Sequence, residues 1–238
     1  MRNIVGDIRS RLQTILPCAP NSSIAIGNGG ASLIWDALTF IGIEQRSAHA
    51  VSGVFGNKFA AISAAAPHLD TPAIARSQYG HFTDLSAADL ASADTLCYTH
   101  NETSTGTYLP TEAMARADDH QLLVVDGTSI AGASCDDLSA IDVYYFSPQK
   151  AFGADGGLWI AILSDKARAR FQRLRTERWI PPMFDLEAAA VASEKDQTYN
   201  TPAVATLALL QSQLRWIEAA GGLPWAASHC HELSQAVY

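Results

Sequence analysis

Short apolar runs of strand length alternate with helical patterns along most of this chain. The stretch "SSIAIGNGGASLIWDALTFIGI" reads as a strand, a glycine turn and a helix. Further apolar runs of strand length lie at 48–51, 96–98, 122–126, 143–146 and 157–163, and helical patterns lie between several of them, notably at 55–66 and 111–117. This alternation predicts an α/β fold whose mostly parallel sheet, of a seven-stranded type, is covered by helices on both faces.

Helical patterns occupy both ends of the sequence. At residues 2–15, apolar side chains recur at helical spacing and predict an amphipathic helix. After residue 163 we expect helices at 165–175, at 201–219 with Pro202 in the first turn, and from 224 onward. Because no Gly, Asn or Pro stops the last pattern before Tyr238, we expect the sequence to end inside a helix.

Size and charge narrow the class of protein. The 238 residues suffice for one large α/β domain, and 48% apolar with 17% charged residues is typical of a globular chain. The net charge of −8 gives no electrostatic footprint for nucleic acid or an anionic membrane. With no spanning-length apolar segment, no secretion signal and four scattered cysteines, we expect a cytoplasmic protein with reduced thiols.

The glycine turn in "AIGNGGAS" is the first candidate site. Gly29 and Gly30 follow a strand, and Ser32 opens a helix, so backbone N–H groups and the positive end of a helix dipole point at one place. The turn is equally compatible with an anion cradle suited to phosphate and with a plain tight connection. A nicotinamide fingerprint fits less well, because Ser32 replaces its third glycine and Glu44 comes before the second strand.

Two charged residues at strand ends are the second and third candidates. Asp126, in "LLVVDGTS", ends a buried strand, where it could serve a ligand or cap the turn through Gly127 and Thr128. Lys150 lies between "SPQ" and a glycine-rich loop, where it is either a surface lysine or a desolvated amine able to form a Schiff base.

A phosphate cradle, a strand-tip aspartate and a lysine at a neighbouring strand end together suit pyridoxal 5′-phosphate. The lysine binds the aldehyde, and the aspartate keeps the pyridine nitrogen protonated so that the ring withdraws electrons from the substrate. By contrast, His229, Cys230 and His231 are one and two positions apart and do not share a helix face, so we expect no metal site there.

Five motifs carry a resemblance to a known family. "GNGGAS", "HNETSTG", "VVDGTS", "YYFSPQKAFGADGGLW" and "DQTYNTPAVATLALL" together resemble phosphoserine aminotransferases, which are fold-type I pyridoxal-phosphate enzymes, and most of all their actinobacterial branch. The resemblance covers essentially the whole chain. It implies an enzyme of serine biosynthesis that converts O-phospho-L-serine and 2-oxoglutarate into 3-phosphohydroxypyruvate and L-glutamate, with 4-phosphohydroxythreonine of vitamin B6 synthesis as a further substrate.

The resemblance assigns roles to residues around the cofactor ring. Lys150 would carry the Schiff base and then act as the base that moves the substrate proton, and Asp126 would pair with the pyridine nitrogen. Phe55 matches the position whose aromatic ring stacks on the cofactor, where many relatives carry Trp. Thr103 would face the cofactor, and Thr128 would lie beside it.

A second group of residues is implied for the cofactor phosphate. Gly30 and Ala31 would supply backbone N–H groups, and Gln149 a side-chain donor. Asn200 and Thr201, in "YNTP", match residues that reach the phosphate of the partner's cofactor across a dimer interface. The resemblance therefore implies a two-fold homodimer whose active sites are built from both chains.

Two parts of the family pattern lie outside this sequence: an N-terminal segment with a His-Arg pair and a smaller C-terminal domain with further basic residues. We expect residues 1–220 to form the cofactor-binding large domain, and 221–238 to begin the helix leading to a small C-terminal domain. The alternatives are a cofactor-binding remnant with little or no activity and another fold-type I transaminase. Arg178 could lie near the site or on the surface.

Overall fold

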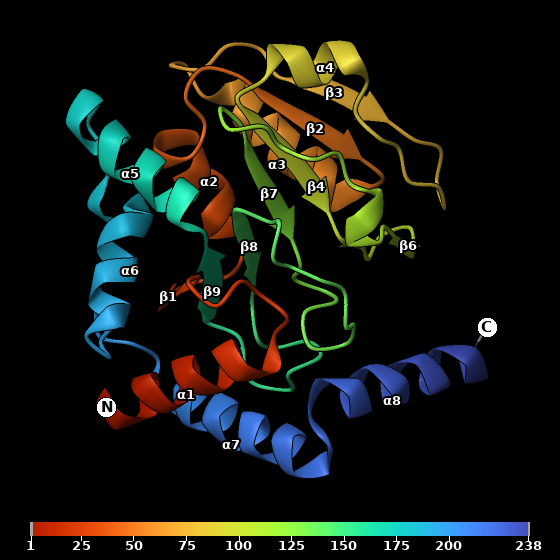
Figure 1. Cartoon of the computed structure of the whole chain (residues 1–238), viewed down its shortest axis with the longest axis vertical. Helices are drawn as coiled ribbons and strands as arrows, with labels where there is room; N and C mark the ends of the chain where they lie inside the picture. The colour runs from red at the N-terminus through yellow and green to blue at the C-terminus, as the bar shows by residue number, and fades with distance from the viewer. Residues whose placement is uncertain (1, 238) are drawn as a thin grey trace.

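A seven-stranded sheet forms the centre of the chain in the computed structural model, which describes residues 2–237. Six strands run parallel, while β9 runs antiparallel to both of its neighbours. The strand order, visible in Figure 1, is β1 (Ser23–Asn28), β9 (Leu158–Leu163), β8 (Val143–Phe146), β7 (Leu122–Asp126), β4 (Thr95–Thr99), β2 (Ser47–Val51) and β3 (Ala73–Arg76). The predicted fold class is confirmed.

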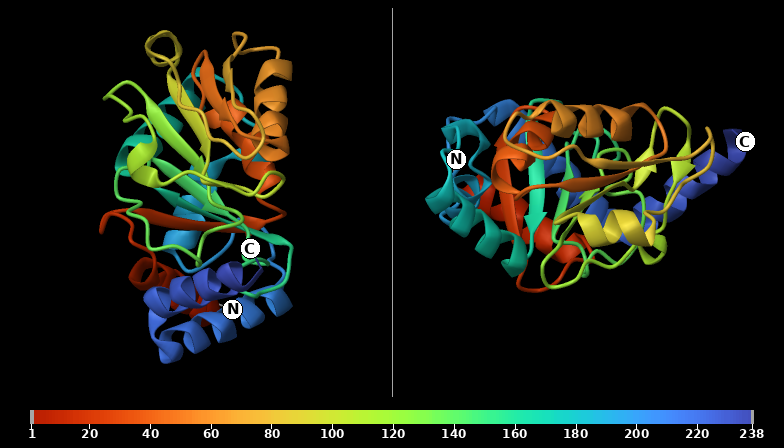
Figure 2. Two further views of the ribbon diagram at one scale, coloured as in Figure 1. Left: turned by 90° about the vertical axis from the view of Figure 1, so that its right-hand side faces the viewer. Right: turned by 90° about the horizontal axis from the view of Figure 1, so that it is seen from above.

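Helices cover both faces of this sheet, as the view from above in Figure 2 shows. One face carries α2 (Ser32–Ile41), α3 (Val54–Ala65), α5 (Asp165–Glu177) and α6 (Leu186–Glu194). The other face carries α1 (Arg2–Ile15), α7 (Val204–Ala220), the first turn of α8 (Gly222–Val237) and, near β3, α4 (Ala87–Ser92). A separate two-stranded ribbon joins β5 (Asn101–Glu102) to β6 (Thr107–Tyr108).

The alternation of side chains along each strand separates two hydrophobic cores. In β7, Leu122 and Val124 pack with the core under α2 and α5, whereas Leu123 and Val125 pack with the core under α1 and α7. Both sets are buried because a parallel sheet is covered on both sides, which explains why these strands read as continuous apolar runs.

The reversed strand β9 determines where the lysine loop lies. Because β9 is antiparallel to β8, the connection at 147–157 turns back at the edge where the parallel strands have their carboxyl ends. The Ser147 hydroxyl donates to the carbonyl of Leu158 across the base of this loop. Lys150 is therefore held beside the carboxyl end of β7, the usual place for ligands in open α/β sheets.

Several local predictions were wrong. The helical pattern at 111–117 forms only one 3-10 turn, Thr111–Ala113, because the residue that follows it, Met114, is already extended. Pro202 does not lie in the first turn of α7, since the helix begins two residues later at Val204. The helices α4 and α6 and the edge strand β3 were not predicted.

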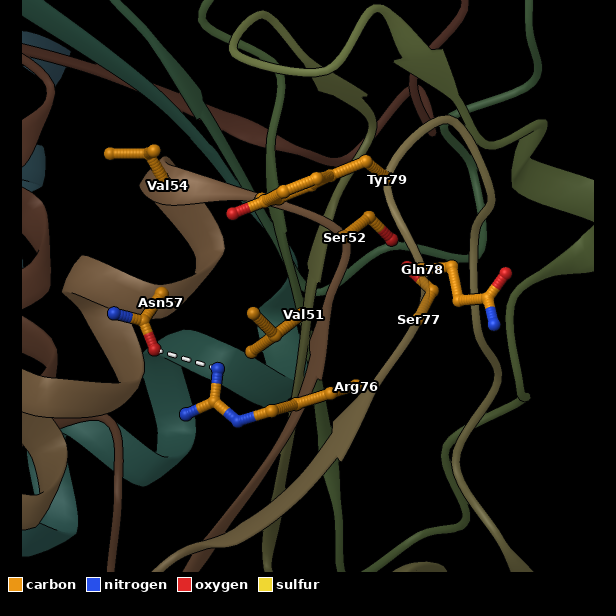
Figure 3. A pocket seen from close by; sticks show the side chains of 9 residues that line it. Val51, Ser52, Val54, Asn57, Arg76, Ser77, Gln78 and Tyr79 are labelled. Carbon is orange, nitrogen blue, oxygen red and sulfur yellow. Dashed lines mark hydrogen bonds between the residues drawn. The ribbon is translucent and has the colours of Figure 1, made fainter.

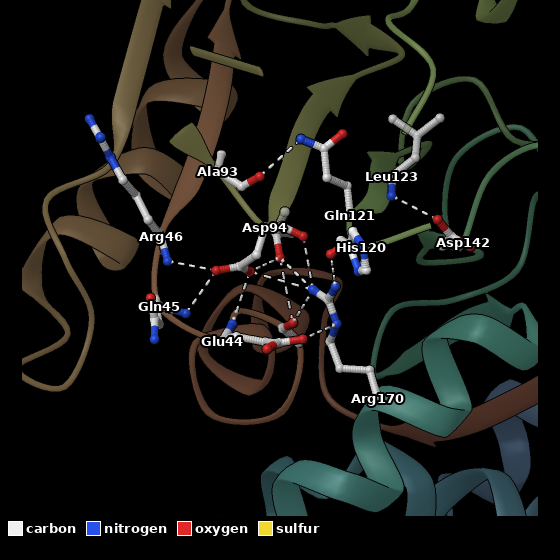
Figure 4. Close-up of polar contacts among 12 residues, drawn as sticks. Glu44, Gln45, Arg46, Ala93, Asp94, His120, Gln121, Leu123, Asp142 and Arg170 are labelled. Carbon is white, nitrogen blue, oxygen red and sulfur yellow. Dashed lines mark hydrogen bonds and ion pairs between the residues drawn. The ribbon is translucent and has the colours of Figure 1, made fainter. Parts of the chain in front are cut away.

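The amino-terminal edge of the sheet is closed by charged side chains, shown in Figure 4. The carboxylate of Asp94, just before β4, accepts hydrogen bonds from the backbone N–H groups of Glu44, Gln45 and Arg46 at 2.8–3.0 Å. The guanidinium of Arg170 reaches the same place from α5 and contacts Glu44 and Asp94. This cluster joins α5 to the starts of β2 and β4.

Candidate active site

A cavity of about 280 Å³ lies at the carboxyl ends of the parallel strands. Eight of the ten predicted site residues line it: Gly30, Ala31, Phe55, Thr103, Asp126, Thr128, Gln149 and Lys150. Five residues that were not predicted as site residues complete the lining: Ser32, Trp35, Thr99, Asn101 and Ser129. The fold thus brings together residues more than a hundred positions apart in the sequence.

The glycine turn and the start of α2 form one end of the cavity. Gly29 has a φ of 111°, in the region that favours glycine, and its N–H donates to the carbonyl of Gly157 at 3.0 Å. No side chain caps α2, whose N-cap is Ala31. A Cβ atom added to Gly30 would approach only the Ser32 hydroxyl, at 3.9 Å, so the space before the helix is open for an anion.

Asp126 forms part of the cavity wall and also caps the next turn. Its Oδ1 accepts hydrogen bonds from the backbone N–H of Thr128 at 2.9 Å and from the Thr128 hydroxyl at 2.5 Å. The side chain is buried, and burial raises the pKa of its carboxyl, with the hydrogen bonds from Thr128 opposing the shift. Both sequence interpretations of Asp126 are therefore compatible with one geometry.

Lys150 extends over the cavity from the loop between β8 and β9. Its Nζ lies 3.3 Å from the Thr103 hydroxyl and 5.6 Å from the centroid of the Phe55 ring. The side chain is exposed, which agrees with the surface-lysine interpretation and not with a desolvated amine.

Two aromatic residues beside Asp126 were not predicted as site residues. The indole N–H of Trp35, from α2, donates to the Tyr145 hydroxyl at 2.7 Å. Both groups contribute hydrogen bonds that lower the pKa of Asp126, less strongly than burial raises it. The spacing of Trp35 and Tyr145 in the sequence does not reveal this role. Tyr145 could have been predicted to lie beside Asp126, because the two residues are register partners in the neighbouring strands β8 and β7.

A pair of polar residues on the same wall was also missed. The Asn101 amide donates to the Ser129 hydroxyl at 2.9 Å, and that hydroxyl donates to the Asn101 carbonyl at 2.6 Å. This exchange fixes the loop after β7 against the loop after β4. Each residue lies three positions after a strand that the sequence analysis had predicted, Asn101 after 96–98 and Ser129 after 122–126.

Asn200 and Thr201 lie outside this cavity. Both are exposed, the Asn200 amide contacts Met183 Sδ, and the Asn28 amide donates to the Thr201 carbonyl at 2.7 Å. Arg178 lies at the opposite edge of the sheet, where its guanidinium donates to the Glu44 carbonyl at 2.9 Å. Arg178 therefore does not contribute to this site.

A second cavity of about 510 Å³ lies on the other side of the first turn of α3 (Figure 3). It is lined by Ser52, Arg76 and Tyr79, among others, and contains none of the predicted site residues. The Arg76 guanidinium already donates to Asn57 at 2.8 Å, and Tyr79 is exposed. Within residues 2–237 no cluster of His, Cys, Asp and Glu side chains could hold a metal ion, and no helix could cross a membrane.

Comparison with known proteins gives a consistent result. The family model described as aminotransferase class-V matches residues 74–238. Phosphoserine aminotransferases from Rhodococcus opacus and from Nocardioides sp. are 39% and 42% identical and align with all of this chain. The chain spans 63% and 64% of the lengths of these two relatives.

Solved structures agree on the fold. A phosphoserine aminotransferase from Cytophaga hutchinsonii matches 95% of this chain and 63% of its own, with a TM-score of 0.85 and 24% identity. An alanine–glyoxylate aminotransferase from Nostoc sp. matches 95% of this chain and 62% of its own, with a TM-score of 0.78 and 19% identity. The architecture is thus shared by aminotransferases with different named substrates.

Proposed function

We propose that this chain, which belongs to the class-V aminotransferase family, binds pyridoxal 5′-phosphate in the cavity around Asp126 and Lys150 and takes part in transamination. The observation that carries the proposal is the joint presence of an uncapped helix start, a buried carboxylate and an amine around one cavity. The helix start suits the cofactor phosphate, the carboxylate suits a protonated ring nitrogen, and the amine suits the aldehyde.

The residues present fit this cofactor. The open space before α2 suits a phosphate, and the N–H groups of Gly30 and Ala31, with the side chain of Gln149, lie at that end of the cavity. A buried carboxylate such as Asp126, with its pKa raised by burial, gains from a cationic N–H partner. Phe55 offers a ring face on the same cavity.

When bound, the cofactor supplies an electron sink for the amino-acid substrate. The chain's own groups would bind and orient it: Asp126 would hold the ring nitrogen, and Phe55 would contact the ring. The amine of Lys150 would take and return the proton at the reacting carbon, as a general base at the cavity. The Thr103 hydroxyl, 3.3 Å from Nζ, orients that amine, and Thr128 orients Asp126.

The substrate pair that we propose is O-phospho-L-serine with 2-oxoglutarate, giving 3-phosphohydroxypyruvate and L-glutamate, as in serine biosynthesis. The names of the relatives that align with the whole chain support this choice. We include 4-phosphohydroxythreonine as a second phosphorylated substrate to be tested. The fold alone does not select among these substrates, because the alanine–glyoxylate enzyme shares it.

We further propose that the active unit is a homodimer in which Asn200 and Thr201 complete the phosphate site of the partner. Their exposure and their distance from the chain's own cavity support this role. For the domain organisation we propose a cofactor-binding domain over 1–220 and a separate segment from 221, the start of the helix that leads to a small C-terminal domain. Gly221 ends α7 with a φ of 122°, and in the following helix only Leu223 and Ala226 are buried among the described residues.

The test is uptake of the cofactor followed by identification of the lysine. The purified chain is titrated with pyridoxal 5′-phosphate while the visible absorbance is recorded, then reduced with borohydride and mapped by peptide mass spectrometry. We expect the label on the peptide that contains Lys150. Label on another lysine, or no visible band, would contradict the proposed site.

Substrate choice is tested on a second portion of the cofactor-loaded protein that has not been reduced with borohydride. Loss of the visible band on addition of O-phospho-L-serine, with return on addition of 2-oxoglutarate, supports the proposed reaction. L-alanine with glyoxylate is the matched control, since it tests another transaminase of the same fold. A stable band with every amino donor would favour the cofactor-binding remnant without activity.

A further inference from the structure

Glu102 is a fully buried carboxylate that joins two walls of the candidate active site. Its side chain has 0% exposure, although it lies in the short strand β5 next to the cavity. Its Oε2 accepts hydrogen bonds from the N–H groups of Phe55 and Gly56, both at 3.0 Å. Its Oε1 accepts from the N–H of Ser104 at 3.2 Å and from the Ser104 hydroxyl at 2.6 Å.

All four contacts of Glu102 are donors, as an acceptor-only carboxylate requires. The Ser104 hydroxyl also accepts from the N–H of Val54 at 2.8 Å. Consequently the first three N–H groups of α3, on Val54, Phe55 and Gly56, are all capped by residues that lie about fifty positions later in the sequence. Helix starts are normally capped by the residue just before them, which here is Gly53 and has no side chain.

The two segments that Glu102 joins carry the two groups that Lys150 touches. Phe55 belongs to the first turn of α3, and Thr103 lies between Glu102 and Ser104. The Lys150 amine lies 3.3 Å from the Thr103 hydroxyl and 5.6 Å from the centre of the Phe55 ring. The position of the amine above the cavity therefore depends on how these two segments are held together.

The same contact also distinguishes the two helices that begin at the cavity. At α3 the positive end of the helix dipole faces the buried Glu102 carboxylate, so that end is already neutralised within the protein. At α2 the N-cap Ala31 provides no side-chain cap, and the helix start remains available to an outside anion. One carboxylate thus directs an anionic ligand to α2 and away from α3.

We infer that Glu102 is the positioning residue of this site: by capping α3 from the Thr103 loop it sets the distance between the Phe55 ring and the Thr103 hydroxyl and so places the Lys150 amine. The inference rests on the proposed function for its cofactor part. Its structural part, a non-local cap on α3, stands on the contacts of this chain alone.

The test compares E102Q with D94N. Asp94 is a suitable control because its carboxylate also accepts from three backbone N–H groups, at the opposite edge of the sheet. Both variants keep the side-chain size, remove one charge and place an NH₂ donor against backbone donors. S104A is a milder second variant, which removes the Val54 contact and the hydroxyl donor to Glu102 but leaves Glu102 bound to the N–H groups of Phe55 and Gly56.

Three quantities are measured. In the cofactor-free protein, amide hydrogen exchange at Val54, Phe55 and Gly56 is expected to accelerate about tenfold or more in E102Q, because these N–H groups lose a charged acceptor. In the presence of pyridoxal 5′-phosphate, E102Q is expected to bind about tenfold to a hundredfold more weakly. The pH midpoint of the visible band of the lysine-bound cofactor is expected to shift as well. D94N should change none of these.

Equal behaviour of E102Q and D94N at the cavity would overturn the inference, and so would faster exchange at α3 with unchanged cofactor affinity and unchanged pH midpoint. If E102Q does not fold, S104A is used in its place. We expect faster amide exchange at Val54 and a smaller loss of cofactor affinity in S104A. No change in either quantity would contradict the inference. If the wild-type chain takes up no cofactor, the proposed function fails, and the exchange data then decide the cap separately.

Discussion

The two edges of the central sheet use the same kinds of charged residue in opposite ways. At the amino-terminal edge, the buried Arg170 donates to the carbonyls of Asp94 and His120 at 2.9 and 2.6 Å and pairs with the Glu44 carboxylate at 2.9 Å. At the carboxyl edge, the buried Asp126 accepts its hydrogen bonds from Thr128 and not from a cationic side chain, and Lys150 is exposed at the cavity. Arg170, whose charge is paired within the chain, stabilises the fold. Asp126 and Lys150 have no ion-pair partner within the described residues and can bind a ligand.

The comparison also applies to carboxylates that cap backbone groups. Asp94 and Glu102 each accept from several backbone N–H groups, one at each edge. Asp94 joins strand starts to α5 and contacts no cavity-lining residue of the candidate site, whereas Glu102 joins two segments of that site. Similar capping chemistry therefore has a different consequence according to the edge at which it occurs.

The largest expected effect is at the carboxyl edge. K150A should reduce transamination about a thousandfold or more, because no other described residue offers an amine at the cavity rim. The melting temperature should change by no more than about 2 °C, since the side chain is exposed. Turnover assays and calorimetry check both halves. Residual activity close to wild type would remove Lys150 from its proposed role.

The second expected effect is at the amino-terminal edge, where a substitution should lower stability and leave cofactor binding unchanged. R170A should lower the free energy of unfolding by about 3 kcal/mol or more, because it leaves Glu44 and Asp94 without their buried partner. Cofactor affinity of the folded protein should stay unchanged. Urea unfolding measures the first and absorbance titration the second. The control is R173A on the same helix, whose half-exposed ion pairs should contribute less than about 1 kcal/mol.

The third prediction places stability and binding in opposition at one residue. Burial raises the folded-state pKa of Asp126 above its unfolded value, so the ionised carboxylate destabilises the fold as the pH rises through the folded-state value. D126N should therefore make the cofactor-free protein more stable at neutral pH. This gain should vanish at a pH below the ordinary carboxyl value of 3.8. Cofactor affinity should fall about tenfold to a hundredfold.

Urea unfolding of wild type and D126N at both pH values checks the sign. A variant that is less stable than wild type at neutral pH would show that the Asp126 cap on Thr128 contributes more than the burial of its charge costs. In that case the main role of Asp126 would be structural, like that of Asp94 at the opposite edge.

Local sequence patterns were sufficient to predict most of the sheet and three parts of the candidate site, namely the glycine turn, Asp126 and Lys150. The strands at 122–126 and 143–146 were predicted with the bounds that the structure shows, because both are continuous buried runs. Asp126 and Lys150 follow from strand ends, since the carboxyl ends of parallel strands meet at one edge. The family motifs supplied the remaining residues around the cavity.

Features that depend on contacts between distant segments could not be predicted. The Glu102 cap joins residues 46 and 47 positions apart, and nothing near Gly53 announces it. The sequence left open whether Lys150 is a surface or a desolvated lysine, because local patterns do not determine how the loop at 147–157 folds. The helix α6 was missed because its short, alanine-rich segment has little periodic signal.

The fourth prediction perturbs the carboxyl edge without removing any functional group. A Cβ atom at Gly53 would lie 2.4 Å from the Ser104 hydroxyl and 2.5 Å from Glu102 Cγ. The φ of Gly53 is 172°, which any residue adopts, so only this crowding opposes a side chain there. G53A should weaken cofactor binding about tenfold by displacing the cap. G156A is the control, because a Cβ atom at Gly156 would meet nothing within 4 Å.

The smallest expected effect is a gain. The centroid of the Phe55 ring lies 5.6 Å from Lys58 Nζ and 5.6 Å from Lys150 Nζ, and the residue lines the cavity of the proposed cofactor. F55W enlarges that face, and an added stacking contribution of about 0.5–1 kcal/mol corresponds to about two- to fivefold tighter cofactor binding. Absorbance titration of F55W and wild type measures this. The hydrogen bond to Glu102 comes from the backbone N–H of residue 55, so the substitution of the side chain leaves this cap in place. The gain in cofactor affinity should therefore disappear in the double variant F55W/E102Q. If the gain persists unchanged, α3 itself positions the ring, and the Glu102 carboxylate does not.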